Sequence, residues 1–323
     1  MKRREFITLL GGAAVAWPLP LRAQERTPRV GVLLNGNAVV PRDLEIVREL
    51  ALIGYIEERN IMYEVRGAAG DSSRLPQLAR ELVATKPEAI VGSGTPAAAA
   101  LFSATRNIPI VMTAVGDPIA LGLTGSISRP TQNVTGFTVS SLSLSAKRLE
   151  LLHGIVPELR KVAYLWVPGN PVATLFEAHV RKAAAVLGIK LVSLPLTSGP
   201  DIAVAFAVAD EEQVTAVLVQ SDPLTLHFSV SIVDECLVRG LPSIHTWPIE
   251  VRNGALISYG PPTVENNPRA AIYVDRILNG AKVADLPFEE PTQIKLVVNL
   301  RTARSIGIAI PPSLLARADE LVE

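Results

Sequence analysis

Small polar residues recur where the sequence predicts that apolar β-strands end. Thr95 and Ser221 each follow such a strand and precede a predicted helix. Backbone N–H groups at a helix N-terminus carry partial positive charge and, together with these hydroxyls, can bind a carboxylate. Asp117 and Asp222 lie at comparable positions and can hold an ammonium group through charge-assisted hydrogen bonds. The four residues together predict a site for an amino-acid-shaped ligand.

Each of these four residues also has a purely structural interpretation. Thr95 and Ser221 are of the residue types that cap helices. Asp117 and Asp222 each precede a proline, a pair that is typical of turns. The sequence alone leaves both interpretations open.

Five further residues are predicted to line the same site, because ligands of open parallel sheets bind just beyond the carboxyl ends of the strands. They are Asn35, Ser93, Asn170, Trp247 and Tyr259. The rings of Trp247 and Tyr259 could stack on a flat ligand, an interaction worth about 1 kcal/mol beyond the burial of area. The alternative is that these rings only pack in the core.

Motifs for catalysis are absent from the sequence. No G-x-G-x-x-G follows the first predicted strand, and neither G-x-x-x-x-G-K-[ST] nor G-x-S-x-G occurs. His153, His179, His227 and His245 lack the spacing of metal ligands, and we favour a surface or core role for each, although His245 lies at a strand end. We therefore expect neither a metal nor another cofactor, and a binding protein in place of an enzyme.

The first half of the chain alternates predicted strands and helices. The continuous apolar run Val30–Leu34 is typical of a buried parallel strand. This βαβ order predicts a doubly wound parallel sheet. The elements that follow the first strand are a helix over 41–53, a strand over 61–65, a helix over 73–85, a strand over 88–91, an alanine-rich helix that runs to 105 and a strand over 108–112.

The second half repeats this organisation after a predicted helix over 144–155. The segment Lys161–Asn170 follows the plan of the first strand: a basic residue, an apolar run and then Gly-Asn. We therefore predict an α/β fold of two doubly wound, Rossmann-like lobes. The further elements are a helix over 171–187, a strand over 190–194, a helix over 201–209, and strands over 215–220, 243–246 and 255–259.

The last part of the chain predicts a hinge. A helix over 264–278, a strand over 293–298 and a short helix after that strand close the pattern. If the helix packs on the first lobe and the strand on the second, the chain crosses between the lobes three times, and such a hinge can open and close. The predicted lobes are residues 27–138 with 261–284, and residues 139–260 with 285–323.

Residues 1–24 have the features of an export signal. Lys2, Arg3 and Arg4 precede an apolar stretch that is shorter than the roughly 20 residues needed to span a bilayer. The Arg3-Arg4 pair favours the twin-arginine route, and ordinary Sec export is the alternative. Cleavage near Ala23 or Gln24 would give a periplasmic protein.

The composition excludes several classes of protein. The chain has 48% hydrophobic and 19% charged residues, which is typical of a folded globular protein. Its 31 basic and 31 acidic residues include no long basic block, so we expect no nucleic-acid partner. The single cysteine, Cys236, cannot form an internal disulfide. We expect a monomer.

Eight segments together identify a family. They are LALIGY with Arg59-Asn60, SGTPAA at 93–98, GDP at 116–118 with LGL at 121–123, NVTG at 133–136, KRLELL at 147–152, SYG at 258–260, ADLP at 284–287 and PPSLLARADE at 311–320. With these segments, the chain after residue 24 resembles the periplasmic substrate-binding proteins of ABC transporters with the type I periplasmic-binding fold, in the branch that includes tryptophan- and tyrosine-binding proteins.

The resemblance implies capture of a small molecule between the lobes by hinge closure, followed by delivery to the membrane permease of an ABC importer. An amino acid or an aromatic or carboxylate compound is the expected ligand. Two alternatives remain open: an exported α/β enzyme with an unrecognised site, and a ligand sensor for a membrane receptor. A DNA regulator of the same fold is disfavoured, because an export signal stands where a helix-turn-helix is needed.

Overall fold

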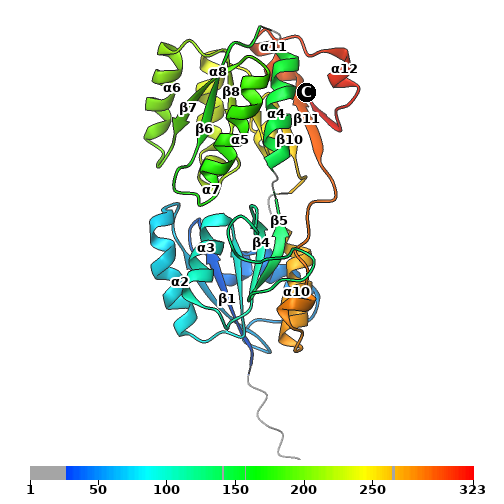
Figure 1. Cartoon of the computed structure of the whole chain (residues 1–323). Helices are drawn as coiled ribbons and strands as arrows, with labels where there is room; N and C mark the ends of the chain where they lie inside the picture. The colour runs from blue at the N-terminus through cyan, green and yellow to red at the C-terminus, as the bar shows by residue number, and fades with distance from the viewer. Residues whose placement is uncertain (1–26, 140–141, 157, 264–265) are drawn as a thin grey trace, which may run out of the picture.

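The computed structural model describes residues 27–139, 142–156, 158–263 and 266–323. The predicted export signal, residues 1–24, lies outside these ranges. The described chain forms two lobes, one above the other in Figure 1, and each lobe is built around its own sheet. The predicted α/β fold with two doubly wound lobes is confirmed.

The sheet of the first lobe is entirely parallel, with the strand order β2-β1-β3-β4-β5. The strands β1, β3 and β4 read as nearly continuous apolar runs because helices cover both faces of the sheet. Chain order reverses between β1 and β3, so their carboxyl ends flank the switch point of the sheet. The strands are β1 (Arg29–Leu34), β2 (Met62–Gly67), β3 (Ala89–Ser93), β4 (Ile110–Val115) and β5 (Val134–Thr138).

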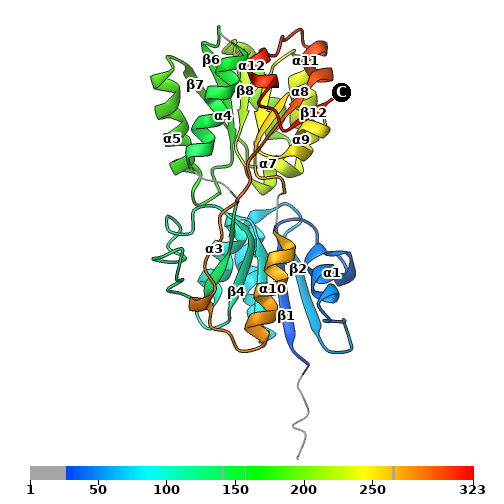
Figure 2. The same ribbon diagram turned by 90° about the vertical axis from the view of Figure 1, so that its right-hand side faces the viewer.

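Two pairs of helices cover this sheet. The helices α2 and α3 pack apolar side chains such as Leu82 and Leu101 on one face, and α1 and α10 pack Leu50 and Val274 on the other. Thus α10, which comes late in the sequence, belongs to the first lobe (Figure 2). The helical elements are η1 (Pro41–Asp43), α1 (Glu45–Leu52), η2 (Ser72–Arg74), α2 (Leu75–Ala84), α3 (Thr95–Ala104), α10 (Asn267–Leu278) and η3 (Val283–Asp285).

The sheet of the second lobe repeats the order of the first and then extends it. Its order is β12-β11-β10-β9-β8-β6-β7, in which β7-β6-β8-β9-β10 corresponds to the first sheet and β11 is antiparallel to β10. The switch point here lies between β6 and β8. The strands are β6 (Lys161–Trp166), β7 (Lys190–Pro195), β8 (Ala216–Val219), β9 (Ser243–His245), β10 (Ile257–Gly260), β11 (Lys295–Asn299) and β12 (Glu320–Val322).

Helices again cover both faces of the second sheet. The helices α4 and α5 bury Leu152 and Val180 on one face, and α6 and α8 bury Phe206 and Ile232 on the other. The helices are α4 (Leu142–Ile155), α5 (Ala173–Val186), α6 (Asp201–Glu211), α7 (Pro223–His227), α8 (Ser229–Val238), α9 (Pro248–Arg252), α11 (Leu300–Ser305) and α12 (Pro312–Leu315).

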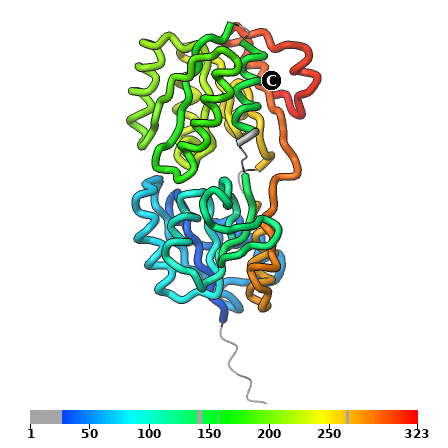
Figure 3. Tube along the Cα trace, viewed as in Figure 1, coloured from blue at the N-terminus to red at the C-terminus, as the bar shows by residue number. Residues whose placement is uncertain are grey.

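The chain passes between the lobes three times: from β5 to α4, from β10 to α10, and from the segment after η3 to β11 (Figure 3). Leu286 and Phe288 pack in the core of the first lobe, and Glu289 bonds through its backbone to Gly136 and Thr138. The third crossing therefore starts after Glu289, later than the boundary predicted after residue 284. We propose residues 27–138 with 261–289, and 139–260 with 290–323, as the two lobes.

Some elements differ from the sequence prediction, which lacked β5, α7, α8, α9 and β12. The helices α7 and α9 are too short to show a helical period. In α8 the exposed Val230 and Val238 blur the apolar face. The strand β5 contains Gly136, where a Cβ would lie 2.2 Å from the Met112 carbonyl oxygen, so close strand pairing requires glycine. The helix predicted over 41–53 starts only at Glu45, because Leu44 is extended.

Candidate functional site

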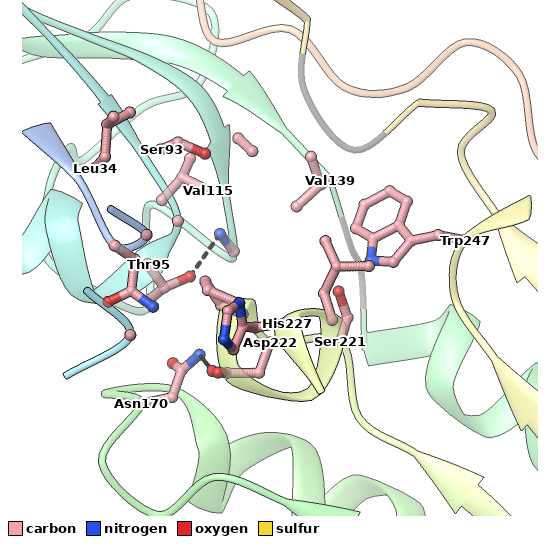
Figure 4. A pocket seen from close by; sticks show the side chains of 18 residues that line it. Leu34, Ser93, Thr95, Val115, Val139, Asn170, Ser221, Asp222, His227 and Trp247 are labelled. Atoms are coloured by element: carbon pink, nitrogen blue, oxygen red, sulfur yellow. Dashed lines mark hydrogen bonds between the residues drawn. The ribbon is translucent and has the colours of Figure 1, made fainter. Parts of the chain in front are cut away.

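A cavity of about 330 Å³ lies between the carboxyl ends of the two sheets (Figure 4). Both lobes contribute to its lining, and most of the contacting side chains are small or apolar. The first lobe contributes Leu34, Asn35, Gly36, Gly70, Ser93, Gly94, Thr95, Ala114, Val115 and Gly116, and the segment that connects β5 to α4 contributes Val139. The second lobe contributes Asn170, Ser221, Asp222, Pro223, Leu226, His227 and Trp247.

The cavity lies at the switch points of both sheets, where open α/β sheets bind their ligands. In the first lobe Asn35 follows β1, and Ser93 ends the neighbouring strand β3. In the second lobe Asn170 follows β6, and Asp222 follows the neighbouring strand β8. The same position in two similar sheets thus supplies the polar lining from both sides.

The two lobes come within contact distance at this cavity. A Cβ at Gly94, before α3, would lie 2.9 Å from Cγ of Pro223, the first residue of α7. A Cβ at Gly116 would lie 3.3 Å from Cγ2 of Val172. Real Cβ atoms essentially never come as close as the first of these distances. Glycine therefore lets the N-termini of α3 and α7 approach each other across the cleft.

Thr95 starts α3 and lines the cavity. Its Oγ1 accepts a hydrogen bond of 2.9 Å from the backbone N–H of Gly116, which ties the start of α3 to the loop after β4. Gly94 is the N-cap of α3, with φ of +86°, and makes no side-chain cap. In the first turn Thr95 and Ala97 have backbone N–H groups and Pro96 has none, and this cavity end of the ten-residue helix carries the partial positive charge of a helix N-terminus.

Asp222 is the buried charged side chain of the cavity, with 6% of its surface exposed. Its Oδ1 accepts a hydrogen bond from the N–H of Leu224 at 2.8 Å, and its Oδ2 accepts one from Nδ2 of Asn170 at 2.7 Å. Burial raises the pKa of this carboxyl to about 6, and the bonds from Asn170 and Leu224 offset only part of that rise. Asp222 makes no salt bridge to any cation in the part of the chain that the structure describes.

Asn170 links the carboxylate to the backbone of the second lobe. Its Oδ1 accepts a hydrogen bond of 3.1 Å from the N–H of Val172, and this fixes its amide so that Nδ2 faces Asp222. In the first lobe, Oδ1 of Asn35 accepts a hydrogen bond of 2.9 Å from the hydroxyl of Ser72. Both amides are thus oriented by the lobe to which they belong.

Trp247 and Ser221 complete the second-lobe side of the cavity, near Val139 (Figure 4). Trp247 follows β9 and is the N-cap of α9, and only 3% of its surface is exposed. Ser221 precedes the residue that caps α7, because Asp222 holds the cap. The cap interpretation therefore applies to Asp222 and not to Ser221.

Two of the nine predicted site residues are not part of the cavity lining. Oδ1 of Asp117 accepts hydrogen bonds of 3.0 Å from the N–H groups of Ile119 and Ala120, the turn that was the structural alternative. Tyr259 packs against the core beneath α4 and α5, and its carbonyl oxygen accepts a bond from Nε of Arg148 at 2.9 Å. The structure brings together the other seven: Asn35, Ser93, Thr95, Asn170, Ser221, Asp222 and Trp247.

His227 and the apolar residues of the cavity lining were not among the predicted site residues. His227 ends α7, a helix too short to be recognised from its pattern, and its ring lies edge-on to that of Phe228 at 4.7 Å. Leu34 and Val115 lie at strand ends, and Val139 lies in the segment that connects β5 to α4. An apolar residue at such a position does not by itself indicate a binding site. His245, by contrast, is fully buried in the core.

Two features are absent from the residues that the structure describes. No group of three or more His, Cys, Asp or Glu side chains there is arranged to hold a metal ion. None of the helices in those ranges has the length and hydropathy needed to cross a bilayer.

Three comparisons with known proteins agree with this geometry. The tyrosine-binding protein of Clostridioides difficile (strain R20291) is 26% identical over 256 residues, which cover 79% of this chain and 73% of that protein. A conserved domain protein from Vibrio cholerae has a similar crystal structure, with a TM-score of 0.83, 28% identity, and coverage of 92% of this chain and 100% of that one. An ABC domain from Streptococcus pneumonia in complex with L-Trp has a TM-score of 0.79 and 25% identity over 92% of this chain and 100% of that one.

The family model described as ABC transporter substrate binding protein matches residues 30–322, which include both lobes and every residue of the cavity lining. The chain therefore belongs to the family of ABC transporter substrate-binding proteins, solute-binding components with the type I periplasmic-binding fold.

Proposed function

We propose that this solute-binding protein captures a free amino acid with an aromatic or large apolar side chain, and releases it chemically unchanged to the permease of an ABC importer. One observation carries the proposal: the buried carboxylate of Asp222, which has no ion pair among the described residues, lies across the cleft from the positive N-terminus of α3. The α-ammonium and α-carboxylate groups of an amino acid match these two charges.

The ammonium group is assigned to Asp222. A cation at this carboxylate would compensate the burial that raises its pKa to about 6. The carboxylate accepts one hydrogen bond from Nδ2 of Asn170 and one from the N–H of Leu224, so its remaining lone pairs are available to a ligand. Charge-assisted hydrogen bonds of this kind are stronger than those between neutral groups.

The carboxylate of the ligand is assigned to the N-terminus of α3. The N–H groups of its first turn and the side chains of Ser93 and Thr95 lie in the cavity wall. Anion binding at such a helix end follows from its unpaired N–H groups and from the helix dipole. Contact between the α3 and α7 ends near Gly94 and Pro223 gives the short separation that two charges on one α-carbon require.

The side chain of the ligand is assigned to the apolar part of the cavity. Leu34, Val115, Val139 and Leu226 line this part together with Trp247. A volume of about 330 Å³ is at the small end of the range for ligand pockets, which favours a single amino acid over a peptide. The tyrosine-binding relative and the relative in complex with L-Trp support an aromatic side chain.

The proposal extends to the place of action and to the partners. The features of residues 1–24 support export, by the twin-arginine or the Sec route, to the periplasm. There the protein acts as a monomer, with a small-molecule ligand and a membrane permease as its partners and without a nucleic acid. It has no catalytic role in this proposal, since importers need their solute unaltered.

A thermal-shift assay with matched ligands tests the proposal. The full chain is heated with L-tyrosine, with N-acetyl-L-tyrosine, which lacks the ammonium group, and with tyramine, which lacks the carboxylate. A ligand at 100 times its Kd stabilises the native state by about 2.7 kcal/mol. We expect L-tyrosine, L-tryptophan or L-phenylalanine to raise the melting temperature and both truncated analogues to fail. An equal shift with N-acetyl-L-tyrosine would contradict the role of Asp222, and no shift with any amino acid would contradict the ligand class.

A further inference from the structure

A chain of buried hydrogen bonds runs behind Trp247. Oε2 of Glu250 accepts bonds from the N–H groups of Trp247 at 2.9 Å and of Thr246 at 3.2 Å. Oε1 of the same carboxylate lies 3.0 Å from Nδ1 of His245. His245 and Glu250 have only 0% and 2% of their surfaces exposed. The strand end that presents Trp247 to the cavity is thus held by a carboxylate that solvent does not reach.

The acceptors in this chain determine which atoms donate. An ionised carboxylate can only accept, so Nδ1 of His245 carries the proton and donates to Glu250. In a neutral imidazole the other nitrogen is then an acceptor, and the hydroxyl of Ser243, 3.2 Å from Nε2, donates to it. Three donors therefore converge on the Glu250 carboxylate: one side-chain N–H and two backbone N–H groups.

Capping of α9 does not by itself account for a buried carboxylate. The helix α9 has only five residues, Pro248–Arg252, and the capping-box bond from the N–H of Trp247 to Glu250 does not require a buried carboxylate. In the same lobe Asp201 accepts bonds from both N–H and Oγ1 of Thr197 and from the N–H of Ser198, at the start of α6, with its side chain on the surface. Removing a carboxylate from water is costly unless its partners are exact in position. The burial of Glu250 fits a residue that fixes the position of the neighbouring backbone segment.

A second buried charge holds the neighbouring strand. Nε of Arg148, on α4, donates to the carbonyl oxygen of Tyr259 at the end of β10, which pairs with β9. Burial lowers the pKa of Arg148 to about 10, so its guanidinium stays charged at neutral pH. The negative charge of Glu250 acts against that lowering of the pKa of Arg148. The carboxyl ends of β9 and β10 are therefore both fixed by ionic groups.

We propose that Glu250, oriented by His245, is a positioning residue that holds the backbone at Thr246 and Trp247 and thereby fixes the indole ring of Trp247 in the wall of the cleft. It does not touch the ligand. Its effect on binding passes through Trp247, and for that part the inference rests on the proposed function. Whether Glu250 fixes the position of the indole ring can be tested without any ligand.

The test measures the accessibility of Trp247 in the ligand-free full chain. Replacing Trp17 and Trp166 by Phe leaves Trp247 as the single tryptophan. Acrylamide quenching and the emission maximum are compared between this chain and its Glu250→Gln variant. Asp201→Asn is the matched control, because it removes a carboxylate that also accepts three hydrogen bonds in this lobe but lies outside the cavity lining.

We expect Glu250→Gln to raise the quenching constant about twofold and to shift the emission to the red. Its amide NH2 faces either the two backbone N–H groups that share Oε2 or Nδ1 of His245, so one side of the carboxylate loses its acceptor and the segment loosens. Asp201→Asn should lower the unfolding midpoint without changing the quenching. His245→Phe, which keeps a ring but removes its N–H donor, should raise quenching less than Glu250→Gln does, and it serves if that variant does not fold. Quenching that is unchanged, relative to the control, in whichever of these variants folds would overturn the proposal.

Ligand measurements separate the two proposals. If L-tyrosine and L-leucine both bind, Glu250→Gln should weaken L-tyrosine more, since only the aromatic ligand uses the indole face. Equal weakening of both would mean that Glu250 stabilises the lobe in general and does not position Trp247. If neither amino acid binds the unmodified chain, the proposed ligand class is wrong, and the quenching comparison still decides the role of Glu250.

Discussion

The carboxyl group of Asp222 connects ligand binding to pH, and the substitution Asp222→Asn makes that connection measurable. Burial raises the pKa of this group from its ordinary value of 3.8 to about 6. Because the folded state binds the proton more tightly than the unfolded state, the carboxyl contributes to stability fully below about pH 3.8, and this contribution is lost as the pH rises through about 6. The difference between the folded and unfolded pKa values of Asp222 corresponds to a change of about 3 kcal/mol in the free energy of unfolding.

The variant removes the titrating group and keeps the shape. Asn at position 222 can still accept a bond from the N–H of Leu224, but its amide faces the amide of Asn170, a mismatch that costs about 1–3 kcal/mol at every pH. The free energies of unfolding of the variant and the parent are compared at two pH values. The constant penalty and the titration of every other group then cancel from the change with pH. Between pH 4.5 and pH 7.5, the free energy of unfolding of the variant should therefore gain about 2 kcal/mol on that of the parent.

Urea unfolding of both proteins without ligand at these two pH values is the assay. Binding provides a second readout with the opposite sign, because an ammonium ligand needs the ionised carboxylate. The affinity of the parent for L-tyrosine should rise about tenfold from pH 5 to pH 7, and that of Asp222→Asn should be weak and flat. A difference in unfolding free energy that does not change with pH would refute the argument that Asp222 is a buried, uncompensated charge.

Three further outcomes are expected. Gly94→Ala should hinder lobe closure and lower the affinity for the ligand at least about tenfold, because the new Cβ meets Pro223. Gly280→Ala is the control: Gly280 has a similar φ and open space around it, so this variant reports the backbone strain alone in an unfolding assay. Equal ligand binding by both variants would exclude the clash. Trp247→Ala should weaken L-tyrosine by about 1–3 kcal/mol in calorimetric titration and L-leucine by less, and the reverse order would remove the indole from the side-chain site. Thr95→Val should weaken every amino acid ligand and lower the melting temperature slightly, through loss of the bond to Gly116; unchanged affinity would separate α3 from the carboxylate.

The fold could be predicted largely because its strands are buried on both faces. Val30–Leu34 and Lys161–Trp166 read as apolar runs that end in polar loops, and the repetition of this plan led directly to two similar lobes. The third crossing was misplaced, because Leu286 and Phe288 carry no local signal of the lobe in which they pack. Short elements such as α7 were missed, since five residues do not define a period.

The candidate site could be predicted in part, because the switch-point rule depends only on strand order. Asn35, Asn170 and Asp222 follow from that rule and lie in the cavity lining. Asp117 follows a strand in the same way, but a two-residue hydrogen-bonded turn takes up its carboxylate, and the choice between turn and ligand depends on three-dimensional surroundings. The role of Glu250 in positioning Trp247 could not be recognised from the sequence. Its partners are backbone N–H groups and a histidine for which the sequence favoured a core or surface role.

Native mass spectrometry of the full chain with L-tyrosine tests the central claim most directly, since it reads the stoichiometry, the identity and the chemical state of the ligand together. The two-lobed cleft predicts a complex of one protein and one amino acid that is lost in Asp222→Asn and that releases L-tyrosine at its original mass. Failure to form the complex with L-tyrosine, L-tryptophan or L-phenylalanine, or release of a compound of altered mass, would contradict capture of an intact amino acid between the lobes.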